Sequence, residues 1–220
     1  MVGIPSSKGG SGDPSPLCVF GVLRGLEACQ VFLTGSDDLN GVRIAIQGVG
    51  RVGSRLAAAL TAKGAAVTVT DIDADAVTRV ASKQPVQVVE PEEIYDVDCD
   101  IFSPCALGGI INDETIGRLR CKVVAGSANN QLAEERFGDE LDRRGILYAP
   151  DYIINSGGLI NVAEEIHGYD SERAMRKTAG IRDVLLTILG AARDNRIPAY
   201  KAADRFAEDR IERIARIRRS

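Results

Sequence analysis

The sequence is poor in metal ligands: it holds a single histidine, His167, and its five cysteines include no C-x-x-C pair. Zinc sites usually need four cysteine or histidine ligands at short spacings, so no common zinc pattern can be assembled and no metal is expected. The odd number of cysteines also argues against a disulfide framework. Reduced thiols, and therefore a cytoplasmic location, are expected.

Long apolar runs and an excess of basic charge are absent as well. No apolar run is long enough to span a bilayer, and residues 1–12 lack the charged-then-apolar pattern of a signal peptide. Lysine and arginine total 27 against 31 aspartate and glutamate residues, so the net charge is −4. This balance argues against a general nucleic-acid binder, and neither a membrane nor a nucleic acid is expected as a partner.

What the sequence does contain is a strand, a glycine turn and a helix in direct succession. The apolar run 42–46 is typical of a buried strand, and residues 51–63 are rich in the alanine and leucine of a helix. Between them Gly48, Gly50 and Gly53 form G-x-G-x-x-G. The first glycine allows the tight turn, the second lets a pyrophosphate approach the backbone, and the third lets the helix pack close to the strand. The anion would lie at the helix N-terminus, where free N–H groups favour negative charge.

An acidic residue follows the next predicted strand, residues 66–70. This residue, Asp71, comes 18 positions after Gly53. A carboxylate there can accept hydrogen bonds from the adenosine ribose and repel a 2′-phosphate, which favours NAD over NADP. The alternative is a nucleotide-free domain of the same fold with a glycine-rich turn.

Predicted strands alternate with predicted helices along most of the chain. Strands without polar alternation indicate a mainly parallel sheet that is covered on both faces. We therefore predict an α/β fold, a Rossmann-type doubly wound sheet with an N-terminal helix and two C-terminal helices. The ligand should lie at the carboxyl ends of the strands. Further strands are expected at 86–89, 99–103, 122–125 and 146–148, and helices at 14–33, 73–82, 131–144, 157–167, 172–194 and 199–218.

The same pattern suggests three parts. Residues 1–35 form an N-terminal loop and helix, residues 36–168 the NAD-binding Rossmann domain, and residues 169–220 a helical segment that packs on it. Residues 126–131 and 149–155 are expected to be loops, and residues 112–119 a helix or a turn.

The loops resemble those of the leucine/phenylalanine/valine branch of the amino-acid dehydrogenases, within the glutamate dehydrogenase superfamily, with the leucine dehydrogenases nearest. The resemblance runs in order over nearly the whole chain. The matching segments are residues 10–16, 47–50, 69–72, 99–108, 112–115, 125–131, 149–152, 155–158 and 202–205.

The resemblance implies oxidative deamination of an L-amino acid with NAD, or the reverse. In the family, an N-terminal domain precedes the segment that matches Gly10, and it carries two lysines that bind the substrate carboxylate and activate water or the carbonyl. This sequence starts just upstream of that segment and contains none of that domain. Deamination needs such groups to move protons, whereas hydride transfer needs mainly cofactor and substrate in the right geometry. We therefore expect activity on a protonated imine and poor ammonia-dependent amination of a keto acid.

The resemblance also implies roles for individual residues. The family has threonine where this chain has Cys18, which weakens an expected contact with the nicotinamide amide. With Cys18, Leu159 and Val162 are the candidate substrate-binding residues. Asn129 and Asn130 match family residues that line the nicotinamide and substrate, and the alternative role for them is a helix cap at the following turn. The candidate cofactor-binding residues are Gly48, Gly50, Arg51, Val52, Gly53, Asp71, Ile72, Cys105, Ala106, Leu107, Asn129, Asn130 and Asn155.

Two residues are candidate acid/base groups in place of the family's lysines. Lys8 lies in the loop before Gly9, near the expected nicotinamide end, and the alternative is a flexible surface lysine. His167 falls where leucine dehydrogenases have tyrosine, and the alternative is a structural histidine. Asp151 and Tyr152 are weaker candidates.

Three functions are compatible with these observations. The first is an NAD(H)-dependent oxidoreductase that acts on an amino or imino small molecule. The second is an NAD-binding protein with a non-redox task, for example a cyclase. The third is a fragment or subunit of a dehydrogenase. Because a surface normally covered by another domain would be exposed, we also expect a homodimer.

Overall fold

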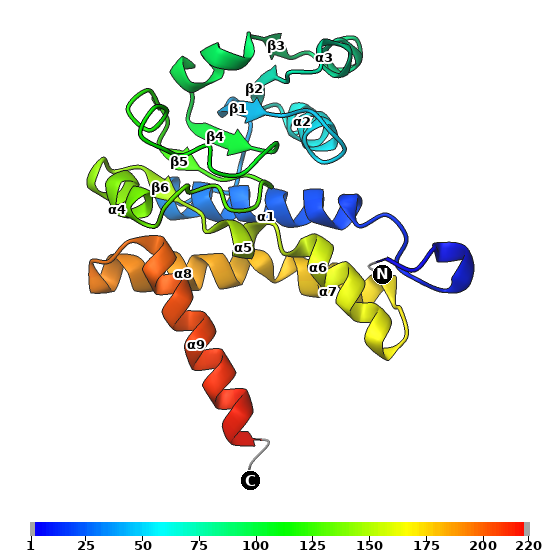
Figure 1. The fold of residues 1–220 in the computed structure, drawn as a ribbon. Helices are drawn as coiled ribbons and strands as arrows, with labels where there is room; N and C mark the ends of the chain where they lie inside the picture. Colours follow the sequence, from blue (N-terminus) through cyan, green and yellow to red (C-terminus); the bar gives the residue numbers. More distant parts are fainter. Residues whose placement is uncertain (1–2, 218–220) are drawn as a thin grey trace.

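The computed structural model describes residues 3–217, in which parallel strands form one six-stranded sheet with helices around it (Figure 1). The strand order is β3-β2-β1-β4-β5-β6. From β1 the chain adds strands toward one edge of the sheet, and from β4 it adds strands toward the other edge. This change in strand order between β1 and β4 is typical of doubly wound dinucleotide-binding sheets. The predicted fold class is confirmed. The strands are β1 (Arg43–Gln47), β2 (Ala66–Thr70), β3 (Gln87–Val88), β4 (Ile101–Pro104), β5 (Val123–Val124) and β6 (Leu147–Tyr148).

The helices follow the strands along most of the chain. Short 3-10 helices are η1 (Ser6–Lys8), η2 (Pro91–Asp96) and η3 (Glu164–His167). The α-helices are α1 (Ser15–Thr34), α2 (Gly53–Ala62), α3 (Ala74–Ala81), α4 (Arg136–Arg143), α5 (Asp151–Ile154), α6 (Gly157–Ala163), α7 (Ser171–Ala179), α8 (Ile181–Asn195) and α9 (Ala199–Ile217).

The sheet is buried on both faces, and the alternation of side chains along β1 shows how. Ile44 and Ile46 pack into a core formed with α1, α2, α3 and α8. Ala45 points to the other face, into a core formed with η2, residues 111–121 and α4. Since successive strand residues face opposite sides, a strand between two cores needs apolar residues at every position. This explains why polar alternation is missing from the strands.

Helix α1 lies under the sheet and packs along α8 and α6 (Figure 1). A Cβ atom added at Gly25 would lie 2.3 Å from Cγ1 of Ile154, so only glycine allows this close approach. Contrary to the sequence expectation, α1 is long and apolar enough to cross a membrane by length and composition. Half of its most apolar window is buried inside the protein, which is the pattern of a core helix.

The C-terminal segment contains three helices between residues 171 and 217, not the predicted two. The predicted helix 172–194 breaks at Gly180, whose N–H points to both Arg176 O (3.3 Å) and Lys177 O (3.2 Å). This tightening of the last turn, at a residue with low helix propensity, separates α7 from α8.

Other boundaries also differ from the prediction. The helix expected after residues 126–131 begins only at Arg136, because the chain at Gln131 is held by tertiary hydrogen bonds: its N–H donates to Asp151 Oδ2 (3.1 Å). The predicted loop 149–155 contains the single-turn helix α5. The helix that begins at Gly157 becomes a 3-10 helix after Ala163, and residues 112–119 form turns.

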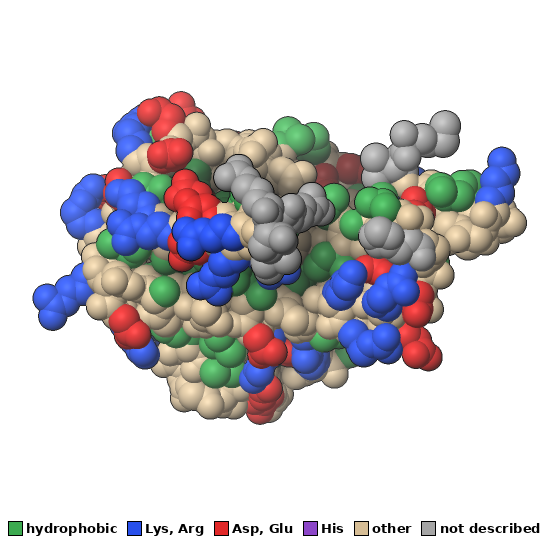
Figure 2. All heavy atoms as spheres, turned by 90° about the horizontal axis from the view of Figure 1, so that it is seen from below, with side chains coloured by type: hydrophobic (Ala, Val, Ile, Leu, Met, Phe, Trp, Pro, Cys, Tyr) green, Lys and Arg blue, Asp and Glu red, His purple; other side chains and the backbone are tan. Residues whose placement is uncertain are grey.

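The second half of α9 extends away from the body of the protein (Figure 1). Its apolar residues Ile211 and Ile214 are 68% and 46% exposed. Seen from below, basic and acidic side chains alternate across this side of the molecule, with hydrophobic side chains between them (Figure 2).

Candidate cofactor and substrate site

The glycine turn follows β1 directly and has the geometry that its sequence predicts. Gly48 has a φ of +96°, and its N–H donates to Thr70 O (2.8 Å). A Cβ atom at Gly53 would lie 1.9 Å from the carbonyl oxygen of Gly48. At Gly50, by contrast, no described atom lies within 4 Å of an added Cβ. Gly48 and Gly53 are therefore required by the backbone, whereas Gly50 leaves open space in front of α2.

Asp71 lies at the carboxyl end of β2, beside the glycine turn. Its Oδ2 accepts a hydrogen bond from the Val49 N–H (2.7 Å), and its Oδ1 accepts one from the Asp73 N–H (3.0 Å). These two bonds hold the carboxylate in place. Because each carboxylate oxygen has two lone pairs, acceptor capacity remains for ribose hydroxyls.

An apolar cavity of about 430 Å³ opens between this carboxylate and the loop after β4. Ile72 and Leu107 are 91% and 77% exposed, so two large apolar side chains stand in solvent at its mouth. Such exposure is costly unless a ligand covers it, and a flat purine ring fits between apolar walls. The lining residues are Gln47, Gly48, Thr70, Asp71, Ile72, Pro91, Ala106, Leu107 and Ile110.

A second cavity, of about 570 Å³, lies on the other side of the glycine turn. Six of its residues are predicted cofactor or substrate residues. Four more were not assigned to the site from sequence: Ser127, Asp151, Tyr152 and Ser156, although Asp151 and Tyr152 were weaker candidates. The lining residues are Cys18, Val52, Ser127, Asn129, Asn130, Asp151, Tyr152, Asn155, Ser156 and Leu159.

Hydrogen bonds between loops shape this second cavity. The side-chain amide of Asn155 donates to Asn129 Oδ1 (2.6 Å) and to Ser127 O (3.3 Å), which joins the loop after β5 to the segment before α6. Asn130 adopts a left-handed φ of 50°. Since α4 starts only at residue 136, the helix-cap alternative for the two asparagines is wrong.

Two further groups on the cavity wall are held in their neutral forms. Burial, and then the nearby Cys105, raises the pKa of Cys18 to about 11, so its thiol is protonated at neutral pH. Burial, and then a hydrogen bond to Asp204, raises the pKa of Tyr152 well above its usual value. The Tyr152 hydroxyl donates to Asp204 Oδ1 (2.6 Å), which fastens α9 to this wall.

Several predicted residues lie away from both cavities. Among the described residues, the lining of the two cavities includes neither Cys105, which packs behind the glycine turn at 3.3 Å from a Cβ added at Gly53, nor the half-buried Val162. The side chain of His167 lies outside the described part of the structure. These three assignments stay predictions.

Lys8 is exposed at the end of η1, in the N-terminal loop. That loop is closed by Glu165, whose Oε1 accepts hydrogen bonds from the backbone N–H of Ile4 (2.8 Å) and of Ser11 (2.7 Å). Glu164, beside it, is 4% exposed and pairs with Arg173 and Lys177. The two glutamates therefore hold the fold together, and a catalytic role for Lys8 stays a prediction.

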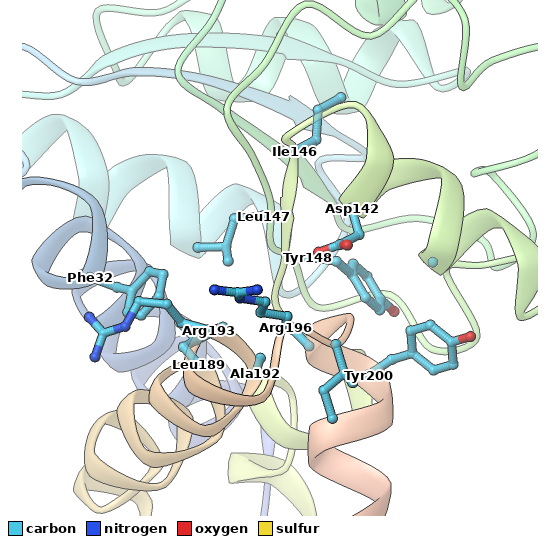
Figure 3. Close-up of a pocket in the computed structure, with 13 residues that line it drawn as sticks. Phe32, Asp142, Ile146, Leu147, Tyr148, Leu189, Ala192, Arg193, Arg196 and Tyr200 are labelled. Carbon is cyan, nitrogen blue, oxygen red and sulfur yellow. The ribbon is translucent and has the colours of Figure 1, made fainter.

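A separate cavity of about 300 Å³ lies at the far edge of the sheet, beyond β6 (Figure 3). Arg196, which has a left-handed φ of 54°, projects into it between Leu147 and Leu189. Of the described residues, those of the glycine turn and Asp71 are not part of its lining. It is distinct from the two cavities beside the glycine turn.

The residues around the glycine turn fit a dinucleotide. Gly50 offers open backbone for a pyrophosphate, Asp71 offers a fixed acceptor for a ribose, and apolar side chains line the cavity beyond it. The polar, asparagine-lined cavity on the opposite side suits an amide-bearing ring. This is the position at the carboxyl ends of parallel strands where such ligands bind.

Comparison with known proteins agrees with this geometry. The chain is 52% identical to a leucine dehydrogenase of Thermoactinomyces intermedius over 99% of its own length and 60% of the relative's. It is 45% identical to a phenylalanine dehydrogenase of Caldalkalibacillus thermarum, again over 99% and 60%. The crystal structure of L-tryptophan dehydrogenase from Nostoc punctiforme superimposes with a TM-score of 0.89 and 43% identity, over 91% of this chain and 61% of that one.

The chain thus spans about 60% of the length of the curated relatives that it matches. A sequence model of the glutamate/leucine/phenylalanine/valine dehydrogenases matches residues 67–185, which is more than half of the chain. The chain belongs to the glutamate/leucine/phenylalanine/valine dehydrogenase family.

Proposed function

We propose that this chain binds NAD(H) and provides the hydride-transfer half of an oxidoreductase that acts on an amino or imino compound. The observation that carries the proposal is the pair of cavities on either side of the glycine turn. One has an apolar wall and a fixed carboxylate, Asp71, and the other has polar amides. This division matches the two ends of one dinucleotide laid across the glycine turn.

Each group of residues has a defined task in this proposal. NAD(H) supplies the chemistry of hydride exchange when bound. Asp71 accepts the ribose hydroxyls, Ile72 and Leu107 cover the adenine, and the N-terminus of α2 faces the pyrophosphate. Asn129 and Asn155 position the nicotinamide end, and the protonated Cys18 thiol adds no charge beside it.

The substrate that we propose is an L-amino acid, or the matching imine, with an apolar side chain. Leu159 lines the second cavity and is 71% exposed, so it offers an apolar wall to a side chain. Relatives named for leucine, phenylalanine and tryptophan support this class.

Calorimetric titration of the 220-residue chain with NADH tests the first step. We expect saturable binding with one cofactor per chain, and Asp71→Ala should weaken it. The second step is tested by following the absorbance of reduced nicotinamide with protonated cyclic imines, which need no enzyme acid to become electrophilic. Binding without turnover of any imine would favour a non-redox task for the bound cofactor, and absence of binding would overturn the proposal.

We further propose that the chain forms a homodimer through the exposed face of α9 and works in the cytoplasm. The exposure of Ile211 and Ile214 supports the first statement, because residues three apart on a helix lie side by side and contiguous exposed apolar surface is often covered by a partner. All five cysteines lie among the described residues and are free thiols, which supports the second. Size-exclusion chromatography with light scattering tests the dimer, and Ile211→Glu should shift it to monomer.

A further inference from the structure

The cavity at the far edge of the sheet, about 300 Å³ in volume, lies between β6, α4 and the corner where α8 meets α9 (Figure 3). This volume is at the lower end of the range for small-molecule sites. The lining shares no residue with the two cavities beside the glycine turn, so a ligand here would occupy space that the dinucleotide does not need. Leu147, Leu189 and Ile197 give the cavity an apolar wall.

Arg196 enters this cavity from a strained position. It ends α8 in the left-handed conformation, with a φ of 54°. Helices usually end in this way at glycine, because a left-handed residue brings its Cβ atom close to the following carbonyl oxygen. The side chain projects into the cavity between Leu147 and Leu189 (Figure 3). An arginine where glycine would be more stable points to a task for its side chain.

Two opposite charges on the lining are unpaired. Within residues 3–217, Arg196 and Asp142 form no ion pair, either with each other or with another residue. Arg193 also lines the cavity, but its Nε already lies 3.1 Å from Asp194 Oδ1. The cavity therefore offers one available cation and one available anion beside an apolar wall.

The edge of the sheet adds backbone groups to these charges. β6 is the last strand of the sheet, and the N–H groups of Leu147 and Ala149 donate to carbonyl oxygens along β5 and its approach, both at 2.9 Å. In a parallel strand, alternate residues direct their N–H and C=O groups to opposite sides. Those of Tyr148 therefore point outward from β6, toward the cavity that this residue also lines.

We propose that this cavity is a second amino-acid site, which takes a free amino acid with an apolar side chain. Arg196 and the Tyr148 N–H donate to its carboxylate, and the bonds from the guanidinium are charge-assisted. Asp142 accepts from its ammonium group, and the apolar wall covers its side chain. A carboxylic acid would leave Asp142 unpaired, and an amine would leave Arg196 unpaired, so a zwitterion fits best.

Titration of the ¹⁵N-labelled chain with L-leucine, without NADH, tests the site by nuclear magnetic resonance. The backbone amides of Tyr148 and Ile197 report on this cavity, and that of Leu159 reports on the second cavity beside the glycine turn. We expect saturable shifts of the first two amides. Leucinamide, which lacks the carboxylate, should bind at least about tenfold more weakly. N-acetyl-leucine, which lacks the ammonium, should bind about two- to fivefold more weakly, because Asp142 is exposed.

Arg196→Gly is the decisive variant, because glycine suits the left-handed position. It should melt at or above the wild-type temperature, so that lost binding cannot be ascribed to unfolding. Its affinity for leucine should fall by at least about fivefold. The matched control is Arg210→Ala, which removes an exposed arginine of α9 outside the lining and should change affinity less than about twofold. Asp142→Asn should weaken leucine binding and leave binding of N-acetyl-leucine unchanged.

Three results would each overturn the proposal. The first is the absence of leucine-induced shifts at Tyr148 and Ile197, and the second is equal leucine affinity in Arg196→Gly and the wild type. The third is tighter binding of a dipeptide that ends in leucine, which would make the ligand a peptide C-terminus. NADH affinity, measured in the same variants, should stay at the wild-type value. Failure of this site therefore leaves the proposed function standing, and failure to bind NADH leaves this site standing.

Discussion

Gly50→Ala should weaken cofactor binding, whereas Gly53→Ala should lower stability, although both glycines belong to one turn. The Cβ atom of Gly53→Ala would lie 1.9 Å from the backbone oxygen of Gly48, which cannot rotate away. The strand and the helix must separate, and overpacking of this kind costs about 1–3 kcal/mol. At Gly50 no described atom lies within 4 Å of the new methyl group, so folding is not opposed.

Thermal unfolding and NADH titration separate the two effects. For a chain of this size, each kcal/mol shifts the melting temperature by about 2–4 °C. Gly53→Ala should therefore melt about 2–12 °C below the wild type. Gly50→Ala should melt at the wild-type temperature or slightly above it, because alanine restricts the unfolded chain. Its methyl group occupies the space in front of α2, so NADH affinity should fall by at least about tenfold.

The reasoning would be refuted by either of two results. If Gly50→Ala melted as low as Gly53→Ala, the open space at Gly50 would not exist in solution. If Gly50→Ala bound NADH as tightly as the wild type, the pyrophosphate would not approach the backbone there. The proposed position of the cofactor would then be wrong.

Three further predictions concern hydrogen bonds around the site. Tyr152→Phe removes the bond to Asp204 and should lower the free energy of unfolding by about 1 kcal/mol in a denaturant titration; an unchanged midpoint would show that this bond does not hold α9. Lys177 and Arg173 hold the pKa of Glu164 below its usual value of 4.5. The stabilising effect of this carboxylate is therefore present above pH 4.5 and is lost as the pH falls through the lower pKa of the folded state. On acidification through this range, the melting temperature of Glu164→Gln should therefore fall less than that of the wild type. Melting temperatures that fall in parallel for the two proteins would contradict this prediction. Glu165→Ala frees the backbone N–H groups that close the N-terminal loop, and limited proteolysis should then cut within residues 4–11 sooner than in the wild type; equal cleavage rates would count against this closure.

Local interactions explain why much of the fold could be predicted. The strand 66–70 has the bounds that were predicted, because its apolar residues are bounded by glycine on one side and Asp71 on the other. Asp73 caps α3 as its side chain accepts from the N–H groups of Asp75 and Ala76. Gly35 ends α1 in a left-handed conformation. Such signals act over a few residues, and the sequence contains all of them.

The sequence by itself therefore determined the alternation of strands and helices, the glycine turn and the residue that follows β2. Tertiary structure decided which further residues complete the second cavity. Ser127, from the loop after β5, lies there beside Asp151 and Tyr152 of α5. Tyr152 is held in turn by Asp204 from α9, 52 residues away. A groove of about 620 Å³ beside Asp71 is likewise lined by residues of two separate helices, α2 and α3. Short-range signals specify where elements start and stop, whereas a cavity depends on which side chains the packed sheet brings opposite one another.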